Sequence, residues 1–324
     1  SCVALLLEKG RWQSLAPLAV LLAGGTPVPL APESPPERIL QIAAECPPAL
    51  ILTDPLCREA AAVSGLPHLT LGDAASAMPA LSQSAHLLPP EVFTVIHTSG
   101  STGVPKGVLL PRKGLANLLA VMRDQFDLSA EDAVLSLSPN HHDMFLPEFI
   151  GNMFLGMRGV YPDPARRKDP AHLANLLRRY GISFWHTVPA MVTMLMDYCD
   201  SLSEADRRDA LSSLKIIGMG GDRIPLNTVR RLFERAPSAR IFSLGGPTEI
   251  TVWNVMSNLL PEDAERRQLP YGKPIHNAEC RVTDSAGRTR PLGVTGEMRC
   301  LGPFLSLGYI RRELNSPSLI HISS

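Results

Sequence analysis

The sequence predicts an α/β fold in which largely parallel sheets are covered by helices, with a smaller β element towards the C-terminus. Short apolar runs alternate with amphipathic stretches over residues 15–244, and Gly and Pro punctuate them. Because crossovers between short buried strands are made by helices, this rhythm favours parallel sheets. After Val252 the alternation stops, and the later apolar segments are typical of antiparallel or barrel-like strands.

Each element is predicted from its periodicity. A period of 3.6 residues predicts helices, and short apolar runs bounded by turn residues predict strands. The predicted helices are residues 15–22, 36–44, 114–125, 145–155, 170–180, 189–199 and 225–235. The predicted strands are residues 27–30, 49–52, 93–97, 133–137, 183–186, 214–219, 240–244, 279–284 and 296–301. Residues 74–90, rich in Ala, Ser and Pro, are expected to form a surface connection.

The composition restricts the possible partners. Of 324 residues 45% are hydrophobic, and 31 basic residues balance 31 acidic ones. A formal charge of zero gives no support for binding nucleic acid or an anionic membrane surface. The longest apolar stretch, residues 15–24, contains Pro17 and is shorter than the roughly 20 residues that span a bilayer. Six cysteines without metal-ligand spacing are expected to be reduced thiols, so we expect a soluble cytoplasmic protein.

A segment rich in Ser, Thr and Gly follows the strand predicted at residues 93–97. It reads Thr98-Ser99-Gly100-Ser101-Thr102-Gly103, and Lys106 comes shortly after it. Glycines let the backbone approach an anion, while amides, hydroxyls and the lysine supply donors and charge, so the segment suits a polyphosphate. It is not a Walker loop, because Pro105 precedes the lysine and Gly107 follows it. The alternative is a polar surface turn with a solvated lysine.

Four segments together resemble adenylate-forming enzymes, the superfamily of acyl-CoA ligases, luciferases and peptide-synthetase adenylation domains. Residues 98–106 resemble its phosphate-binding signature, and residues 245–249, Gly-Gly-Pro-Thr-Glu, are similar to its aromatic-G-P-T-E segment. Residues 296–310 resemble the motif that closes the nucleotide site, and residues 18–32 the early helix–strand motif. Their order and approximate spacing imply an incomplete large domain of such an enzyme.

The resemblance implies a role for each matched residue. Thr248 would contact the α-phosphate, and Glu249 would hold Mg²⁺, a hard cation that prefers carboxylate oxygen. Together with Lys106 these two are the expected catalytic residues. The ATP phosphates would be held by Thr98, Ser99, Gly100, Ser101, Thr102, Gly103 and Lys106, and the rest of the nucleotide site would be formed by Gly220, Gly221, Asp222, Gly245, Gly246, Pro247 and Thr248. Asp222 also has the position of a cap for the helix at residue 225, and both roles are compatible.

One position departs from the family pattern. Most members have Tyr or Phe immediately before G-P-T-E, where the ring stacks on adenine, but this chain has Gly245. The motif therefore does not identify what stacks on the base.

Asp143 is the expected partner of a substrate ammonium group. It lies in residues 140–149, which align with the stretch where amino-acid-activating domains carry such an aspartate. A carboxylate in an apolar pocket is costly unless a cation pairs with it, which favours an amino acid over a fatty or aryl acid. The alternative is an Asp at a helix N-terminus. His142 would border the substrate carboxylate, and with His141 it lacks a third ligand at metal spacing.

The resemblance also implies the other pocket walls and a substrate. The walls would be Met144, Pro147, His186, Ile217, Met219, Leu244, Val252 and Trp253, although buried elements contain such residues in any case. Residues 185–191, 220–226 and 243–249 look like the cysteine-activating domains of thiazoline-forming synthetases, which also tend to have Gly-Gly at this place. We expect cysteine first and serine or threonine next, although His186, Met219 and Pro147 differ from that group.

The chain is expected to be part of a larger polypeptide. Residues 1–250 would form the α/β layers and residues 251–314 the smaller β element, whereas residues 315–324 match nothing in the family. The family's T-G-D motif and its small C-terminal domain with a bridging lysine are not found in the sequence. A degenerate protein is the alternative to a gene fragment.

The expected function is ATP- and Mg²⁺-dependent activation of an amino acid as an aminoacyl-adenylate. The acyl group would then pass to the phosphopantetheine of a peptidyl carrier domain in nonribosomal peptide synthesis. An acyl- or aryl-CoA ligase of the same superfamily is the second possibility. A catalytically inactive nucleotide-binding module is the third.

Overall fold

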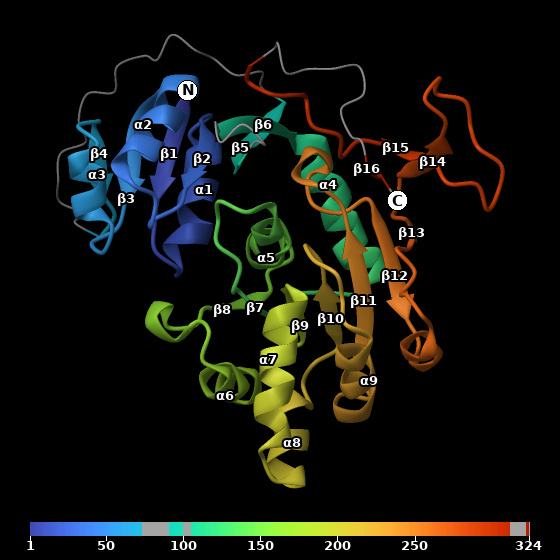
Figure 1. Ribbon diagram of the computed structural model, residues 1–324. Helices are drawn as coiled ribbons and strands as arrows, with labels where there is room; N and C mark the ends of the chain where they lie inside the picture. The colour runs from blue at the N-terminus through green and yellow to red at the C-terminus, as the bar shows by residue number, and fades with distance from the viewer. Residues whose placement is uncertain (73–90, 100–104, 312–321, 324) are drawn as a thin grey trace.

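Two sheets joined by a β-hairpin form the framework of the chain (Figure 1). The computed structural model describes residues 1–72, 91–99, 105–311 and 322–323, and the side chains of Ser99, Ile322 and Ser323 are not among the described parts. The expected surface connection at residues 74–90 lies outside this range. Within it, no helix combines the length and the apolar character needed to cross a membrane.

The first sheet has four parallel strands in the order β2-β1-β3-β4. Helix α1 packs on one face through Ala16 and Val20, while α2 and α3 cover the other face. The predicted helix–strand–helix–strand order of this part is confirmed, and β1, α3 and β4 were not predicted. The elements are β1 Cys2–Leu6, α1 Trp12–Leu22, β2 Thr26–Leu30, α2 Pro36–Glu45, β3 Pro48–Thr53, α3 Arg58–Val63 and β4 His68–Thr70.

A hairpin of β5 (Val92–Ser99) and β6 (Pro105–Pro111) lies between the two sheets (Figure 1). Its strands are antiparallel, and Thr98 pairs with Lys106. Val95 packs in the core of the first sheet and Ile96 in the core of the second, because successive side chains of a strand point to opposite faces. Only the first of these strands was predicted.

The second sheet has seven strands in the order β13-β12-β11-β10-β9-β7-β8. Strands β7 to β11 are parallel, as predicted, while β12 and β13 extend the sheet in antiparallel fashion. Of residues 251–314, which were expected to form the smaller β element, strands β12 and β13 therefore belong to the large sheet. The strands are β7 Ala133–Leu135, β8 Arg158–Val160, β9 Phe184–Thr187, β10 Ile216–Met219, β11 Arg240–Gly245, β12 Val255–Leu259 and β13 Lys273–Pro274.

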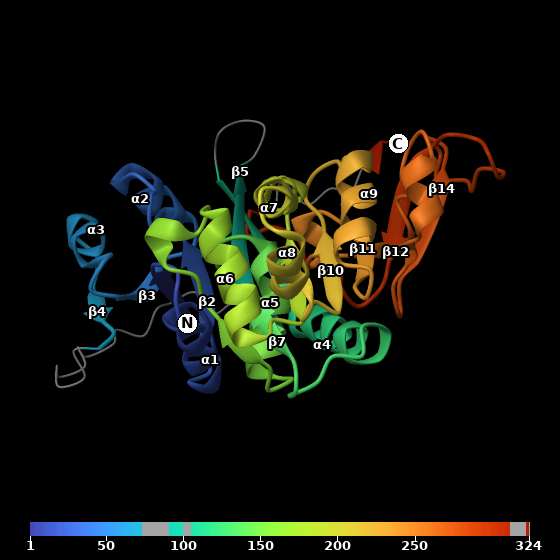
Figure 2. The same cartoon turned by 90° about the horizontal axis from the view of Figure 1, so that it is seen from below.

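Helices cover both faces of this sheet. Figure 2 shows α9 and α4 on opposite sides of β10 and β11. Alternation along the strands divides the core accordingly: Trp185 and Ile217 pack with α6, α7 and α9, whereas Phe184 and Ile216 pack with α4 and α5. The helices are α4 Arg112–Ala120 with the π-helix η1 Val121–Gln125, α5 Leu146–Met153, α6 Pro170–Tyr180, α7 Pro189–Asp200, α8 Glu204–Leu211 and α9 Leu226–Arg235.

Local chemistry explains where α6 begins and ends. Asp169 accepts hydrogen bonds from the amides of Ala171 and His172, and Pro170 occupies the first turn. Gly181, with φ 58°, ends the helix in the left-handed conformation. Four 3-10 turns complete the helical elements of the described chain: η2 Asp143–Phe145, η3 Pro164–Arg166, η4 Thr248–Ile250 and η5 Pro261–Glu265.

The smaller β element is a separate antiparallel sheet. It consists of β14 (Glu279–Thr283), β15 (Glu297–Leu301) and β16 (Ile322–Ser323), in that order. Over the residues that the structure describes, this sheet is open, so the barrel-like form of the prediction is wrong and its antiparallel form is confirmed. Three short strands lack the number and stagger that closure requires.

Candidate active site

Two adjoining cavities lie at the carboxyl ends of the parallel strands of the second sheet. One has a volume of about 600 Å³ and the other about 790 Å³. They share the lining residues Gly221, Leu244, Gly246 and Pro247. In open α/β sheets, ligands bind outside the carboxyl ends of the strands, so both cavities have the expected position for a functional site.

The smaller cavity brings together most of the predicted substrate-binding residues. Those that line it are His142, Asp143, Met144, His186, Leu244, Val252 and Trp253. Its walls also include residues that the sequence did not indicate: Leu137, Ser138, Pro139, Arg167, Lys168, Thr187, Val188 and Met191. These residues lie at or just after the ends of β7 and β9, shortly before α6, or in the first turn of α7. They could have been found from strand order, which the sequence alone does not give.

Three predicted wall residues do not line the cavity. Ile217 and Met219 are fully buried against the helices on the opposite face of the sheet, and Pro147 is buried in α5. Gly218, between them, faces the cavity side, because a Cβ there would lie 2.6 Å from Leu244 and 3.4 Å from His186. The alternation of side chains along β10 explains why the predicted pair points away.

Asp143 is linked to the predicted phosphate motif. The Thr248 hydroxyl donates a hydrogen bond of 2.7 Å to Asp143 Oδ2. Burial is the main cause that raises the pKa of Asp143, with a smaller contribution from the nearby Glu249 carboxylate. The hydrogen bonds from Thr248 and from the Met144 amide oppose the shift, and the net pKa is about 6. A carboxylate in this environment is stabilised by any cation that enters the cavity. Asp143 is the first residue of the 3-10 turn η2, and His142 occupies the N-cap position, so the alternative of a capping Asp is not observed.

His186 is held as a neutral wall residue. Its Nδ1 lies 3.3 Å from the Met144 carbonyl, and its Nε2 accepts from the Trp253 indole N–H at 3.2 Å. This arrangement places the proton on Nδ1, and complete burial lowers the pKa to about 4. The two rings meet edge to face, with centroids 4.8 Å apart. Burial also lowers the pKa of His141 to about 4 and that of His142 below its ordinary value.

A buried ion pair supports the floor of the cavity. Lys9, in the connection between β1 and α1, lies 3.2 Å from Glu148 Oε2 and donates to the Ser138 carbonyl at 2.5 Å. Glu148 Oε1 accepts from the amides of Leu137 and Ser138 at 3.0 and 2.7 Å. Burial lowers the pKa of Lys9, and Glu148 opposes that shift. No sequence motif indicated this pair, which joins the two sheets behind the cavity.

The glycine-rich turn after β10 lies where it was predicted. Gly220 lines the smaller cavity, Gly221 lines both, and Asp222 lines the larger one. The Asp222 carboxylate accepts from the Arg223 amide at 2.6 Å, whereas α9 starts after Pro225 without a side-chain cap. The capping role considered for Asp222 is therefore not observed. Its position at the cavity remains consistent with the predicted nucleotide site.

Glu249 is connected to the hairpin through residues 306–310. Tyr309 donates to Glu249 Oε1 at 2.6 Å, and the Ser306 amide donates to the Glu249 carbonyl at 2.7 Å. Tyr309 pairs with Val108 of β6, and the Ile310 amide donates to the Gly107 carbonyl at 2.9 Å. The segment thus ties η4 to the strand that carries Lys106. Of the predicted phosphate loop, Gly100, Ser101, Thr102 and Gly103 lie outside the described residues.

The donor set near η4 fits a magnesium ion bound with a nucleotide. Mg²⁺ is commonly held by one or two carboxylates together with phosphate oxygens and water, and Glu249 supplies such a carboxylate. Among the described residues, no group of three or more His, Cys, Asp or Glu side chains could hold a metal ion. Gly246 lines both cavities and Gly245 lines the larger one, and neither position has room for a side chain, because neighbouring atoms lie within 2.5 Å of where its Cβ would be.

A chain with this fold and these motifs around two joined cavities is an adenylate-forming ligase. It belongs to the family of AMP-binding enzymes, whose family model matches residues 1–310. This match extends over nearly the whole chain. The chain is also homologous to the adenylation domains of nonribosomal peptide synthetases.

Several relatives carry this homology. Pyochelin synthetase PchF of Pseudomonas aeruginosa is 35% identical over 309 residues, which are 95% of this chain and 17% of the synthetase. Tyrocidine synthase 3 of Brevibacillus parabrevis is 29% identical over 98% of this chain and 5% of its own length. A crystal structure of the nonribosomal peptide synthetase FmoA3 bound to AMPPNP superposes with a TM-score of 0.85 at 31% identity, covering 98% of this chain and 33% of that one. The chain therefore spans a small part of these relatives.

Proposed function

We propose that this chain activates an amino acid as an aminoacyl-adenylate at the expense of ATP. The single observation that carries the proposal is the position of Asp143. Its carboxylate lies in one cavity and is hydrogen-bonded to Thr248, at the border with a second cavity that suits a nucleotide. An ammonium group on the substrate would stabilise this carboxylate, and the substrate carboxylate would then point towards η4.

Adenylate formation would take place near Thr248, between the substrate in the smaller cavity and the nucleotide in the larger one. A substrate carboxylate oxygen would bond to the α-phosphorus, and the bond from that phosphorus to the pyrophosphate oxygen would break. Lys106 and Mg²⁺ on Glu249 would stabilise the negative charge that collects on the phosphate oxygens. Thr248 would donate to the α-phosphate or to Asp143, which links the two subsites. The relation to AMPPNP-bound FmoA3 supports ATP as the nucleotide.

The acyl group would next pass to a carrier. The sulfur of a phosphopantetheine thiol would bond to the acyl carbon, the bond from that carbon to the phosphate oxygen of AMP would break, and the thiol proton would be released. Relatives named as peptide synthetases support a peptidyl carrier domain as the partner. Catalysis in this way would place the chain in nonribosomal peptide synthesis, as one region of a larger polypeptide.

We further propose a small amino acid as the substrate, with cysteine first and serine or threonine next. The cavity wall of Leu244 and Trp253 supports the predicted likeness to cysteine-activating domains. His186 adds no free hydrogen-bonding group, because both of its nitrogens already have partners in the protein. The side-chain end of the pocket is thus mainly apolar, which suits a thiol better than a hydroxyl.

The experiment compares each amino acid with the same acid lacking its amino group. L-cysteine and 3-mercaptopropionate, and L-serine and 3-hydroxypropionate, are titrated calorimetrically into the protein and into Asp143→Asn in the presence of Mg²⁺ and a non-hydrolysable ATP analogue. We expect the amino acid to bind much more tightly than the acid that lacks the amino group, and only in the unchanged protein. Equal binding of both acids would instead favour an acyl-CoA ligase.

A further inference from the structure

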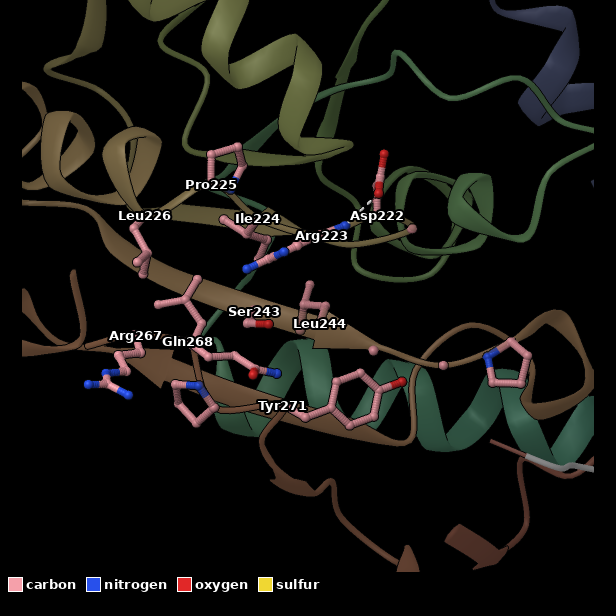
Figure 3. A pocket seen from close by; sticks show the side chains of 16 residues that line it. Asp222, Arg223, Ile224, Pro225, Leu226, Ser243, Leu244, Arg267, Gln268 and Tyr271 are labelled. Atoms are coloured by element: carbon pink, nitrogen blue, oxygen red, sulfur yellow. Dashed lines mark hydrogen bonds between the residues drawn. The ribbon is translucent and has the colours of Figure 1, made fainter. Parts of the chain in front are cut away.

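The larger cavity has an aromatic residue that no motif predicted. Its lining includes residues 267–271, which precede β13, together with Asp222, Ser243 and Gly245. Figure 3 shows the Tyr271 ring extending along β11 beyond Leu244. This is the side of the site where the family pattern has an aromatic residue at the position of Gly245.

Tyr271 occupies the space that a side chain at residue 245 would need. A Cβ on Gly245 would lie 2.5 Å from Tyr271 Cε2, 2.6 Å from Cζ and 2.7 Å from Oη. The ring therefore lies directly on the backbone of β11. Tyr271 is nevertheless 47% exposed, so part of its surface remains open towards the cavity that it lines.

The local backbone holds the ring in this place. Gly272 has a φ of 129°, and a Cβ there would lie 2.4 Å from the main chain of Met256 in β12. Only glycine allows this close crossing, after which Lys273 and Pro274 pair with β12. Burial raises the pKa of Tyr271, and the neighbouring thiols of Cys300 and Cys280 raise it further, so the ring is a neutral phenol at physiological pH.

We propose that Tyr271 supplies the aromatic surface on which the adenine base of ATP stacks in this protein. The ring reaches, from the connection before β13, the place that an aromatic side chain at residue 245 fills elsewhere in the family. This inference rests on the proposed function, because it takes the larger cavity as the nucleotide subsite. Asp222 and Gln268 line the same cavity and provide polar groups for the edge of the base (Figure 3).

Binding of ATP and of inorganic triphosphate separates the base from the phosphates. Both are titrated calorimetrically with Mg²⁺ into the protein, Tyr271→Phe and Tyr271→Ala, and circular dichroism verifies that each variant is folded. A base–aromatic stack contributes enough to change affinity by about tenfold or more. We expect Tyr271→Ala to lose at least this factor for ATP and nothing for triphosphate, whereas Tyr271→Phe binds both normally. Tyr180→Ala, at the end of α6 and also partly exposed, is the matched control and should bind as the unchanged protein does.

The outcomes distinguish this inference from the proposed function. If Tyr271→Ala binds ATP as tightly as the unchanged protein, the stacking role is wrong while the proposed function stands. If the unchanged protein binds no ATP, both are wrong. An equal loss for ATP and triphosphate would also contradict stacking, because triphosphate has no base.

A second pair of variants tests whether residues 245 and 271 share one place. Gly245→Tyr alone should weaken ATP binding, because its Cβ would meet the Tyr271 ring. Gly245→Tyr combined with Tyr271→Ala should bind ATP more tightly than either single variant, since the aromatic ring is restored without the clash. If the double variant binds ATP no more tightly than Tyr271→Ala, an aromatic ring at residue 245 does not replace that of Tyr271, and the inference that the two rings share one place is wrong.

Discussion

Thr248 and Asp143, which are 105 residues apart in the chain, are joined by a hydrogen bond of 2.7 Å from the hydroxyl to the carboxylate. One partner belongs to the G-P-T-E segment beside the nucleotide cavity, and the other lines the substrate cavity. A change in charge on Asp143 therefore reaches the phosphate motif through one side chain. This relationship makes the two subsites a single unit and underlies the first three predictions, which concern Asp143 and Thr248.

Amino-acid binding should depend on pH through Asp143. Its pKa in the folded protein is about 6, above the ordinary value of 3.8, so the carboxyl group is protonated at pH 4 to 5 and ionised above pH 7. Only the ionised form pairs with an ammonium group, and we expect affinity to fall as the pH drops through about 6. Calorimetric titrations from pH 5 to 8 measure this. Asp143→Asn should bind weakly at every pH, and a wild-type profile that is flat over this range would contradict the assignment.

The same shift has a consequence for stability with the opposite sign. Because folding raises this pKa, ionisation of Asp143 disfavours the native state, and its contribution to the free energy of unfolding falls as the pH rises from about 4 to about 6. Comparing urea denaturation of the unchanged protein and Asp143→Asn isolates this contribution. As the pH rises from about 4 to about 6, the free energy of unfolding of the unchanged protein should fall relative to that of Asp143→Asn. A difference independent of pH would show that burial does not control this group.

Loss of the Thr248 hydroxyl should move the pH midpoint of amino-acid binding upwards. That hydroxyl stabilises the ionised form of Asp143, so Thr248→Val raises the pKa of the carboxyl group further. Thr248→Ser keeps a hydroxyl and is the matched control. Titrations as a function of pH compare the midpoints of the three proteins. Identical midpoints for the Val and Ser variants would contradict the link between the subsites.

Removing the charge of Lys9 should destabilise the protein strongly. Lys9→Met leaves Glu148 fully buried without its cation, and breaking a buried ion pair in this way costs about 3–5 kcal/mol. Lys9→Met with Glu148→Gln removes the unpaired charge as well, and should recover part of the loss. Urea denaturation measures both variants. A double variant less stable than Lys9→Met alone would contradict the ion-pair account.

Lys106 should contribute to nucleotide binding and little to folding. It is half-buried and pairs with Thr98 at the end of the hairpin where the two strands are connected. The strand that carries it also pairs with Tyr309, which donates to Glu249. We expect Lys106→Ala to weaken ATP binding by about tenfold or more, as loss of a charge-assisted contact would, while the thermal midpoint stays nearly constant. Lys113→Ala, an exposed lysine at the start of α4, is the control. If Lys106→Ala and Lys113→Ala bind ATP with equal affinity, the alternative interpretation of residues 98–106 as a polar surface turn is supported instead.

Periodicity predicted much of the fold because most helices and strands of this chain are locally consistent. The parallel strands β7, β9, β10 and β11 were all predicted, and their alternation places residues such as Phe184 and Trp185 in different cores. β6 was not predicted, because its apolar run directly follows the lysine of a recognised motif. β12 was not predicted either, since its Val-Met-Ser-Asn-Leu sequence lacks a clear pattern.

The site was predicted where motifs carry it and missed where only the fold does. Asp143 and Thr248 came from separate motifs and meet in the structure. Ile217 and Met219 were placed in the pocket by alignment, but a single-residue change of register decides which face a strand residue occupies. Lys9 and Tyr271 depend on contacts with residues far away in the chain. The role proposed for Tyr271 follows only from the contact of its ring with the backbone of Gly245, which the sequence does not reveal.

Exchange of labelled pyrophosphate into ATP, catalysed by the protein that contains this chain, decides between amino-acid activation and its alternatives. Every proteinogenic amino acid, several aryl acids and the two deaminated acids are offered in turn, with the unchanged protein and with Asp143→Asn. We predict exchange with one or a few small amino acids, cysteine foremost, and the loss of this exchange in Asp143→Asn. Exchange that proceeds with an acid lacking an amino group, and equally well in Asp143→Asn, would contradict this prediction.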